Sequence, residues 1–462
     1  MSTPSVRIHP VGARGIRLRL GFALAGPALA LALALAAGCA TRPAIPAAAA
    51  PAAFPSVRIA ILSDLHLFDA STSRPGPAYD RNLLRGLKLQ AESRAILEEA
   101  LPRMADEGPD IVLVCGDLTK DGERASHELA AWELAELEKD GARSAGTRVY
   151  VIPGNHDILN PDAARYEGDA VVPVESISAL DFASIYRDLG YGEALRRDPS
   201  SLSYLAEPLP GLWLLAIDSC RYLENRASPI ASGRVAPPTL AWIDGVLADA
   251  RSRGAVVLAF MHHGLLEHFR GQKRSVPSRL VDGAERLAAL LASGGVRVVF
   301  TGHGHVQDIA ERRIGPQVLF DVATGSLVTY PNPWRMVRID GAGRMDVRTD
   351  RVLATADRPD GFPEYSESRL RDGLAALLAG QLERSGARGA DAALIAGQAA
   401  AIGVQFYRGD EHVGDVRLET AGLNAWGRMI AGFLRGPLTD LGNDLPPADN
   451  ELTIDLIPVA AE

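Results

Sequence analysis

Short clusters of aspartate, asparagine and histidine recur along this chain, and nearly all of them directly follow a run of apolar residues. The clusters are Asp64-x-His66, Asp117, Asn155-His156-Asp157, His262-His263 and His303-x-His305. Carboxylate oxygens mixed with imidazole nitrogens suit Fe, Mn, Zn or Co ions better than Ca or a thiolate-preferring ion. The clusters therefore predict a metal site. Asp117 has two carboxylate oxygens, enough to contact two ions.

The apolar runs that carry these clusters have the length and composition of buried β-strands. They are Val57–Leu62, Ile111–Val114, Val149–Ile152, Leu212–Ile217, Val256–Met261 and Val296–Phe300. Between these runs lie segments whose apolar residues are spaced as in amphipathic helices. They are Ala91–Met104, Ser126–Asp140, Pro238–Ala250 and Gly283–Ala292. This alternation predicts a layered α/β domain. In open α/β sheets, sites form at the carboxyl ends of strands, which is where the clusters stand.

Two other stretches differ from this pattern. The segment from Phe68 to Asn82 is polar and punctuated by proline and glycine, and we predict a long loop that overhangs the site. After about residue 360 the chain becomes rich in Ala and Leu at helical spacing, without metal-ligand clusters. The predicted helices are Ser366–Gly380, Ala390–Ile402 and Ala421–Phe433. We therefore predict a helical C-terminal subdomain, residues 360–462, after the α/β domain with the metal site at residues 56–355.

The N-terminus has the order of a secretory signal: a basic segment, an apolar run from Leu20 to Ala37, and then Gly38-Cys39. Leu35-Ala36-Ala37-Gly38-Cys39 resembles a bacterial lipoprotein signal, which implies removal of residues 1–38 and lipidation of Cys39. Residues 39–55 are mostly Ala and Pro and predict a tether. An uncleaved membrane anchor is the alternative. Both place the protein in the cell envelope, outside the cytoplasm, and Ala40 favours the outer membrane if the cell has one.

Charge and cysteine content limit the partners. The net charge of −9 becomes more negative once the leader arginines are removed, whereas a surface for duplex nucleic acid needs the opposite sign. Once Cys39 is assigned to lipid, only Cys115 and Cys220 remain. Whether they pair as a disulfide is open, and so is the oligomeric state. His263 and His268 are open between a role beside the site and a structural one.

Taken in order, these motifs resemble the calcineurin-like metallophosphoesterase family. The resemblance implies a four-layer α/β/β/α sandwich and two transition-metal ions, Fe, Mn, Zn or Co. One ion would be bound by Asp64, His66, Asp117 and His305, and the other by Asp117, Asn155, His262 and His303. A hydroxide shared by the ions would attack the phosphoester. His156 corresponds to the family's candidate proton donor. Asp157 either orients His156 or caps the turn, and we favour the turn-capping role.

Further motifs narrow the resemblance to a bacterial group of 3′,5′-cyclic-nucleotide phosphodiesterases, often lipoproteins, with a helical C-terminal domain. They are Gly116-Asp117-Leu118-Thr119, Gly122-Glu123, Ser126-His127-Glu128-Leu129, Met261-His262-His263 and Thr324–Pro331. We therefore predict hydrolysis of cyclic nucleotides or related small phosphodiesters. Phosphomonoesters, another envelope phosphoester, or metal binding without catalysis are the alternatives. A serine esterase or zinc protease is disfavoured, because the chain has neither Gly-x-Ser-x-Gly nor His-Glu-x-x-His.

Overall fold

The structure is a computed structural model that describes residues 54–139 and 146–457. The predicted leader, Cys39 and residues 40–53 of the tether lie outside the described residues. Among the helices of the described ranges, none has both the length and the apolar character that a membrane crossing requires.

The first sheet has six strands in the order β17-β16-β15-β1-β2-β3. Their bounds are Val57–Leu62 (β1), Ile111–Val114 (β2), Arg148–Val151 (β3), Pro333–Ile339 (β15), Arg344–Arg351 (β16) and Glu451–Asp455 (β17). β1, β2 and β3 are parallel, whereas β15, β16 and β17 join as antiparallel neighbours. The carboxyl ends of the three parallel strands therefore meet at one edge of the sheet.

The second sheet has seven strands in the order β13-β14-β12-β10-β8-β7-β6. Their bounds are Arg196–Arg197 (β6), Tyr204–Leu209 (β7), Leu212–Ile217 (β8), Val256–Met261 (β10), Val298–Thr301 (β12), Asp308–Ile314 (β13) and Gln317–Ala323 (β14). The central strands β8, β10, β12 and β14 are parallel. The remaining strands form two small sheets. One is the antiparallel hairpin of β4 (Ala164–Glu167) with β5 (Ala170–Pro173), and the other is the parallel pair of β9 (Gly233–Arg234) with β11 (Val281–Asp282).

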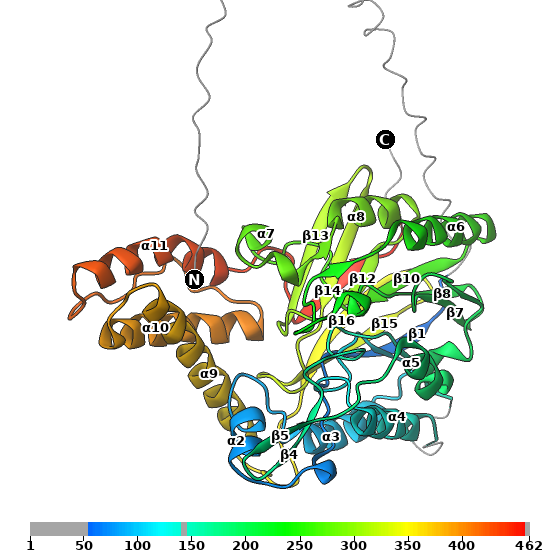
Figure 1. Cartoon of the computed structure of the whole chain (residues 1–462). Helices are drawn as coiled ribbons and strands as arrows, with labels where there is room; N and C mark the ends of the chain where they lie inside the picture. Colours follow the sequence, from blue (N-terminus) through cyan, green and yellow to red (C-terminus); the bar gives the residue numbers. More distant parts are fainter. Residues whose placement is uncertain (1–53, 140–145, 458–462) are drawn as a thin grey trace, which may run out of the picture. The chain divides into compact units, whose positions relative to one another are not determined.

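Strand β8 shows how the layers stack. Leu212, Leu214 and Ala216 belong to the hydrophobic core that both sheets share. Trp213, Leu215 and Ile217 point to the opposite face, as the two-residue period of a strand requires, and pack with α6 (Pro237–Arg253) and α8 (Ala284–Ser293). Figure 1 shows these two helices beside the second sheet.

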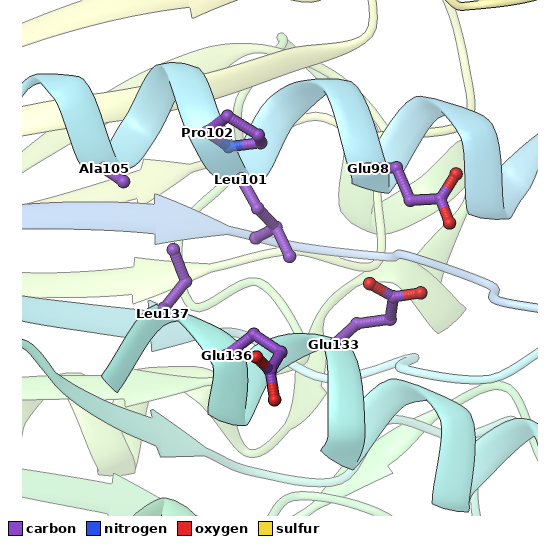
Figure 2. A pocket seen from close by; sticks show the side chains of 7 residues that line it. All are labelled: Glu98, Leu101, Pro102, Ala105, Glu133, Glu136 and Leu137. Carbon is purple, nitrogen blue, oxygen red and sulfur yellow. The ribbon is translucent and has the colours of Figure 1, made fainter. Parts of the chain in front are cut away.

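The first sheet is covered by α3 (Ser93–Asp106) and α4 (Arg124–Lys139), whose apolar residues join the shared core. The four-layer α/β/β/α sandwich is therefore confirmed. Between these two helices lies a surface groove with an apolar floor and a rim of glutamates, shown in Figure 2. It is lined by Glu98, Leu101, Pro102, Ala105, Glu133, Glu136 and Leu137. None of the predicted site residues lies in this groove.

Local sequence signals account for the ends of several helices. α6 begins at Pro237, where a missing N–H costs nothing, and it ends at Gly254, whose φ of 65° suits glycine. α5 (Ala179–Ile185) begins with a capping box between Ser178 and Asp181. The predicted loop at residues 68–82 is wrong in part, because α2 (Pro77–Leu83) begins inside it, with Pro77 in its first turn.

The predicted C-terminal helices are present as α9 (Phe362–Arg384), α10 (Gly389–Arg408) and α11 (Ala425–Leu441). α9 and α10 pack against each other, and Leu370, Val404 and Phe406 from them pack around Val306. The helical prediction is wrong at the chain's end, because β17 pairs with β16 there. Leu452 and Ile454 alternate with polar residues in β17, the pattern of an edge strand. The domain boundaries remain a prediction.

Candidate metal centre

All seven predicted metal ligands come directly after strands of the two sheets. Asp64 and His66 follow β1, Asp117 follows β2 and Asn155 follows β3. His262 follows β10, and His303 and His305 follow β12. Because β1–β3 are parallel to one another, as are β10 and β12, each sheet presents its ligands at a single edge.

The backbone at these ligands is unusual. Asp64, His66, Asp117, His303 and His305 all have positive φ, between 40° and 62°. In the described part of the chain only eight residues other than glycine adopt this conformation, and five of them are these predicted ligands. L-residues adopt it at a free-energy cost, and such strain concentrates at functional sites. The turns therefore aim polar side chains inward at the expense of local backbone preference.

The first group of ligands consists of Asp64, His66, Asp117 and His305, each with one ligand atom within 4.8 Å of all the others. Nε2 of His305 lies 3.1 Å from Oδ1 of Asp64, and Nε2 of His66 lies 3.6 Å from Oδ2 of Asp117. Oδ1 of Asp64 is buried and has no hydrogen-bond partner. A buried carboxylate oxygen without a hydrogen bond, facing imidazole nitrogens, fits a metal-ion site.

The second group consists of Asp117, His262 and His303, again with ligand atoms within 4.8 Å of one another. Nε2 of His262 lies 3.4 Å from Oδ2 of Asp117 and 3.1 Å from Oδ1 of Asn155. Asp117 is thus common to both groups, which is the arrangement expected of a bridging carboxylate. The structure brings all seven predicted ligands together.

Outer contacts orient the imidazoles. Nδ1 of His262 donates to the carbonyl oxygen of Cys115 at 2.8 Å, which leaves Nε2 to face Asp117. Nε2 of His303 lies 3.1 Å from the carbonyl oxygen of Ser278, so Nδ1 is the nitrogen that remains for a metal ion. Asp64 is held through Oδ2 by the hydroxyl of Ser63 at 2.5 Å and by the backbone N–H of His303 at 2.9 Å.

Two motif glycines allow this close packing. A Cβ on Gly154 would overlap both the backbone nitrogen and Oδ1 of Asp117. A Cβ on Gly302 would overlap the hydroxyl of Ser63 and lie 2.6 Å from Oδ2 of Asp64. Any side chain at either position would therefore displace a predicted ligand.

Burial and neighbouring charges set the protonation of the histidines. Burial lowers the pKa of His303 to about 3, and burial together with the charge of Lys88 lowers the pKa of His66 well below its ordinary value. Both rings are thus neutral, the form that binds metal ions. His262 differs, because Asp117 outweighs the effect of burial and raises its pKa to about 9. A metal ion there would have to compete with that proton.

His156 lies beside the two groups without joining either. Its backbone N–H donates to Oδ1 of Asp117 at 2.9 Å, and its ring Nδ1 lies 2.9 Å from Oδ1 of Asp121. Asp121 also forms an ion pair with Lys120. Burial alone would raise the pKa of Asp121, but the hydrogen bond to His156 and the charge of Lys120 lower it. The carboxylate that orients His156 is therefore Asp121, which sequence analysis missed.

The neighbouring Asp157 has the turn-capping role that we favoured. Its carboxylate accepts from the backbone nitrogens of Gly154, Leu118 and Thr119 at 2.8–3.1 Å. It therefore locks the turn after β3 onto the turn after β2. His263 also has a structural role, since its Nδ1 lies 2.8 Å from the hydroxyl of Ser219 and its Nε2 3.2 Å from the carbonyl oxygen of Ala231.

A second residue missed from the sequence is Lys88. Its Nζ lies 3.4 Å from Nδ1 of His66, and Asp117, Asp121 and Asp64 all act on its charge. Burial nevertheless lowers its pKa below the ordinary value for lysine. Lys88 belongs to no motif and precedes α3, so nothing in the sequence pattern distinguishes it from a surface lysine.

The two cysteines in the described part of the chain, Cys115 and Cys220, are both free: Cys115 is buried after β2, and the thiol of Cys220 lies 3.2 Å from the carbonyl oxygen of Pro153. The disulfide left open by the sequence is thus not formed.

The donor set contains imidazole nitrogens, carboxylate oxygens and one amide oxygen. Such a mixed set fits first-row transition metals, which accept both kinds of ligand, better than Ca or Mg. The unpartnered oxygen of Asp64 and the shared carboxylate of Asp117 agree with two adjacent ions. The residues present therefore fit a dinuclear transition-metal centre.

Several known proteins are similar to this chain. Among solved structures, a dimetal phosphatase from Danio rerio is 16% identical, with a TM-score of 0.47 over 64% of this chain and 97% of that chain. A purple acid phosphatase from yellow lupin (Lupinus luteus) seeds is 14% identical, with a TM-score of 0.42 over 66% of this chain and 53% of that chain. No curated protein matches the chain. Residues 57–307, more than half of the chain, match the calcineurin-like phosphoesterase family, and the chain belongs to that family.

Proposed function

We propose that this phosphoesterase is a phosphodiesterase that hydrolyses cyclic nucleotides or related small phosphodiesters with two transition-metal ions. Asp64, His66, Asp117 and His305 would hold one ion, and Asp117, Asn155, His262 and His303 the other. The observation that supports a dinuclear centre most directly is the carboxylate of Asp117, which both groups of ligands share. When bound, such ions polarise the phosphoester and lower the pKa of the attacking water.

The protein's own residues would supply the proton and hold the substrate's charge. Asp121 fixes Nδ1 of His156, which leaves Nε2 available to donate a proton to the departing oxygen. His66 and His156 meet edge to face, with ring centroids 4.9 Å apart, so the proton donor lies directly beside the metal ligands. Lys88, on the other side of His66, would attract the phosphate oxygens.

Diester preference rests on the motifs around these residues. Glu123 and His127 of the motifs shared with the cyclic-nucleotide phosphodiesterases are buried. His127 lies 2.8 Å from the carbonyl oxygen of Asp157 and 2.8 Å from the hydroxyl of Tyr186, so it supports the turn that contains His156 and Asp157. These motif residues support the site from outside and do not contact substrate. The proposed preference for diesters is therefore inferred from the similarity of the motifs alone.

Parallel assays of the purified full-length protein test this choice. The substrates are bis(p-nitrophenyl) phosphate, p-nitrophenyl phosphate and 3′,5′-cyclic AMP, each with added Mn²⁺ and with a chelator. We expect metal-dependent turnover of the diesters above the monoester. A higher rate on the monoester would establish a phosphomonoesterase. Two bound ions without turnover of any of the three would favour a narrower envelope phosphoester or a binding role.

We also propose that the protein is secreted and lipid-anchored through Cys39 in the cell envelope. The basis is the apolar run that ends in Leu35-Ala36-Ala37-Gly38-Cys39. Metabolic labelling with a fatty acid should mark the wild-type protein and not the Cys39→Ala variant. Equal labelling of both proteins would exclude this anchor.

A further inference from the structure

A second group of carboxylates, of which Asp308 and Asp449 are buried and Asp444 is half-buried, lies where the C-terminal segment meets the second sheet. Asp308 begins β13, Asp444 follows α11 and Asp449 precedes β17. One carboxylate oxygen from each lies within 4.8 Å of the other two. We call these three residues the carboxylate cluster. It contains none of the ligands of the dinuclear centre.

Glu411, which follows α10, also faces the carboxylate cluster. It is only 4% exposed, its backbone carbonyl oxygen accepts from the backbone N–H of Asp444 at 2.9 Å, and the charges of Asp308 and Asp444 act on its carboxylate. Oε2 of Glu411 and Oδ1 of Asp444 are both buried without a hydrogen-bond partner. Burying carboxylate oxygens without partners is costly, so these two atoms indicate a missing positive ligand.

The cationic side chains in contact with the cluster neutralise it only in part: Asp308 and Asp321 raise the pKa of His268 well above its ordinary value, so its one positive charge is shared between these two carboxylates. His268 lies between Asp308, at 2.7 Å, and Asp321, at 3.3 Å. Arg335 donates to the carbonyl oxygens of Asp449, Asp308 and Ala323 rather than to carboxylates. Asp410 adds a further negative charge, and its carboxylate accepts from the backbone N–H of Asp449.

Mutual repulsion is the electrostatic result. Burial and the charge of Asp308 raise the pKa of Asp449 to about 9, that of Asp444 to about 7 and that of Glu411 to about 8. Asp449 cannot turn away, because its two oxygens accept from the backbone nitrogens of Ile309 and Asp410, both at 2.7 Å. The carboxylates are held together against this repulsion.

We propose that Asp308, Asp444, Asp449 and Glu411 bind a divalent cation that prefers oxygen ligands, Ca²⁺ before Mg²⁺. The donors are carboxylates alone, with no imidazole in the set, which is the preference of a hard cation. Ca²⁺ tolerates irregular geometry and several carboxylates, whereas Mg²⁺ requires a near-octahedral shell and retains water. Asp444 also lines a surface pocket with Arg270, Thr439 and Asn443, which gives the cation a path from solvent.

The proposed cation would join three turns of the C-terminal segment to the start of β13. Asp308 lies three residues after His305, a ligand of the dinuclear centre, so the two sites share one stretch of backbone. The cation would thus fix the C-terminal helices to β13, the strand that follows the turn with His303 and His305. Its binding does not depend on the proposed substrate.

Calcium binding by the full-length protein tests the proposal. The protein is first loaded with Mn²⁺ and desalted, and Ca²⁺ is then titrated by calorimetry and by equilibrium dialysis with ⁴⁵Ca. We expect one saturable Ca²⁺ site in the wild type. In Asp444→Asn and in Glu411→Gln, the affinity for Ca²⁺ should be at least about tenfold lower. Asp440→Asn is the matched control, because Asp440 lines the same pocket but is outside the carboxylate cluster. His262→Ala, which damages the dinuclear centre, should bind Ca²⁺ like the wild type.

Thermal unfolding provides a second measurement, in which the difference in unfolding temperature between Asp444→Asn and the wild type should change sign when Ca²⁺ is added. Without Ca²⁺, Asp444→Asn should unfold at a higher temperature than the wild type, because it relieves repulsion. With saturating Ca²⁺ the wild type should be the more stable of the two. The proposal is overturned if wild-type protein binds no Ca²⁺, or if Asp444→Asn and Glu411→Gln both bind it with wild-type affinity. Loss of Ca²⁺ binding in His262→Ala would equally overturn it, by placing the Ca²⁺ in the dinuclear centre.

Discussion

The dinuclear centre and the carboxylate cluster are both groups of buried acids, yet they are built differently. In the dinuclear centre, imidazoles and an amide accompany two aspartates, and strand ends of both sheets position them. The carboxylate cluster and the adjacent Glu411 offer oxygen donors only, and three of these four acids come from turns outside the sandwich. Ligand type thus separates a site suited to transition-metal chemistry from a site suited to structural binding.

Loss of one histidine ligand should give the largest effect and separate the two sites. His303→Ala removes a ligand of the second metal ion, and we expect kcat/KM to fall at least about 100-fold. Ca²⁺ binding and the circular dichroism spectrum should not change. His412→Ala, an exposed histidine beside the carboxylate cluster, is the control and should retain activity. Wild-type rates in His303→Ala would disprove the ligand assignment.

Removal of the proposed proton donor should have an effect that depends on the leaving group. His156→Ala should lower kcat about 100-fold for alkyl esters, which need protonation, and far less for p-nitrophenyl esters. Asp121→Asn should show the same selectivity more weakly, because the ring of His156 remains but is poorly oriented. Equal losses on both classes of ester would argue against proton donation by His156.

A smaller effect is expected from Lys88. Lys88→Met keeps much of the side-chain volume but removes the charge beside His66, so we expect KM to rise about tenfold with a smaller change in kcat. Lys273→Met, which removes an exposed lysine paired with Glu285, is the matched control. An unchanged KM in Lys88→Met would show that this lysine does not contact substrate phosphate.

The pH dependence of stability tests the carboxylate cluster and Glu411 without involving the dinuclear centre. The folded-state pKa values of Asp449, Asp444 and Glu411 are about 9, 7 and 8, all above their unfolded values. Folding therefore favours their protonated forms, and without Ca²⁺ their contribution is greatest below about pH 4 and is lost as the pH rises through 7 to 9. Urea unfolding should show this loss in wild type, less of it in Asp444→Asn, and little with saturating Ca²⁺. Identical pH profiles with and without Ca²⁺ would contradict the expectation.

The two sites also differ in how far the sequence could predict them. The dinuclear ligands stand in short motifs directly after apolar strands, so one pattern gives both their chemistry and their position. Asp121 and Lys88 also belong to this site, but the sequence around them contains no motif that identifies them as site residues. The carboxylate cluster joins Asp308 to Asp449 across a long stretch of chain, and only the tertiary fold brings them together.

The fold shows the same division between local and long-range information. Parallel strands with uniform apolar runs, such as β2 and β10, were evident from sequence, and so were the main helices. The antiparallel strands β13, β15 and β16 contain many charged residues and a proline, and they are defined by pairing rather than by composition. Residues 451–455 form strand β17 because they pair with β16, and their composition alone does not identify them as a strand.

The pairing of β16 with β17 has a consequence for how this chain can be dissected. Arg348 is in register with Glu451, so the helices α9 to α11 leave and re-enter the sheet at neighbouring positions. In effect they are an insertion between adjacent strands, although they lie near the end of the sequence. Cutting the chain after β16 would remove an edge strand along with the helices. An internal deletion that closes β16 and β17 with a tight hairpin turn would remove the helices and leave the sheet intact.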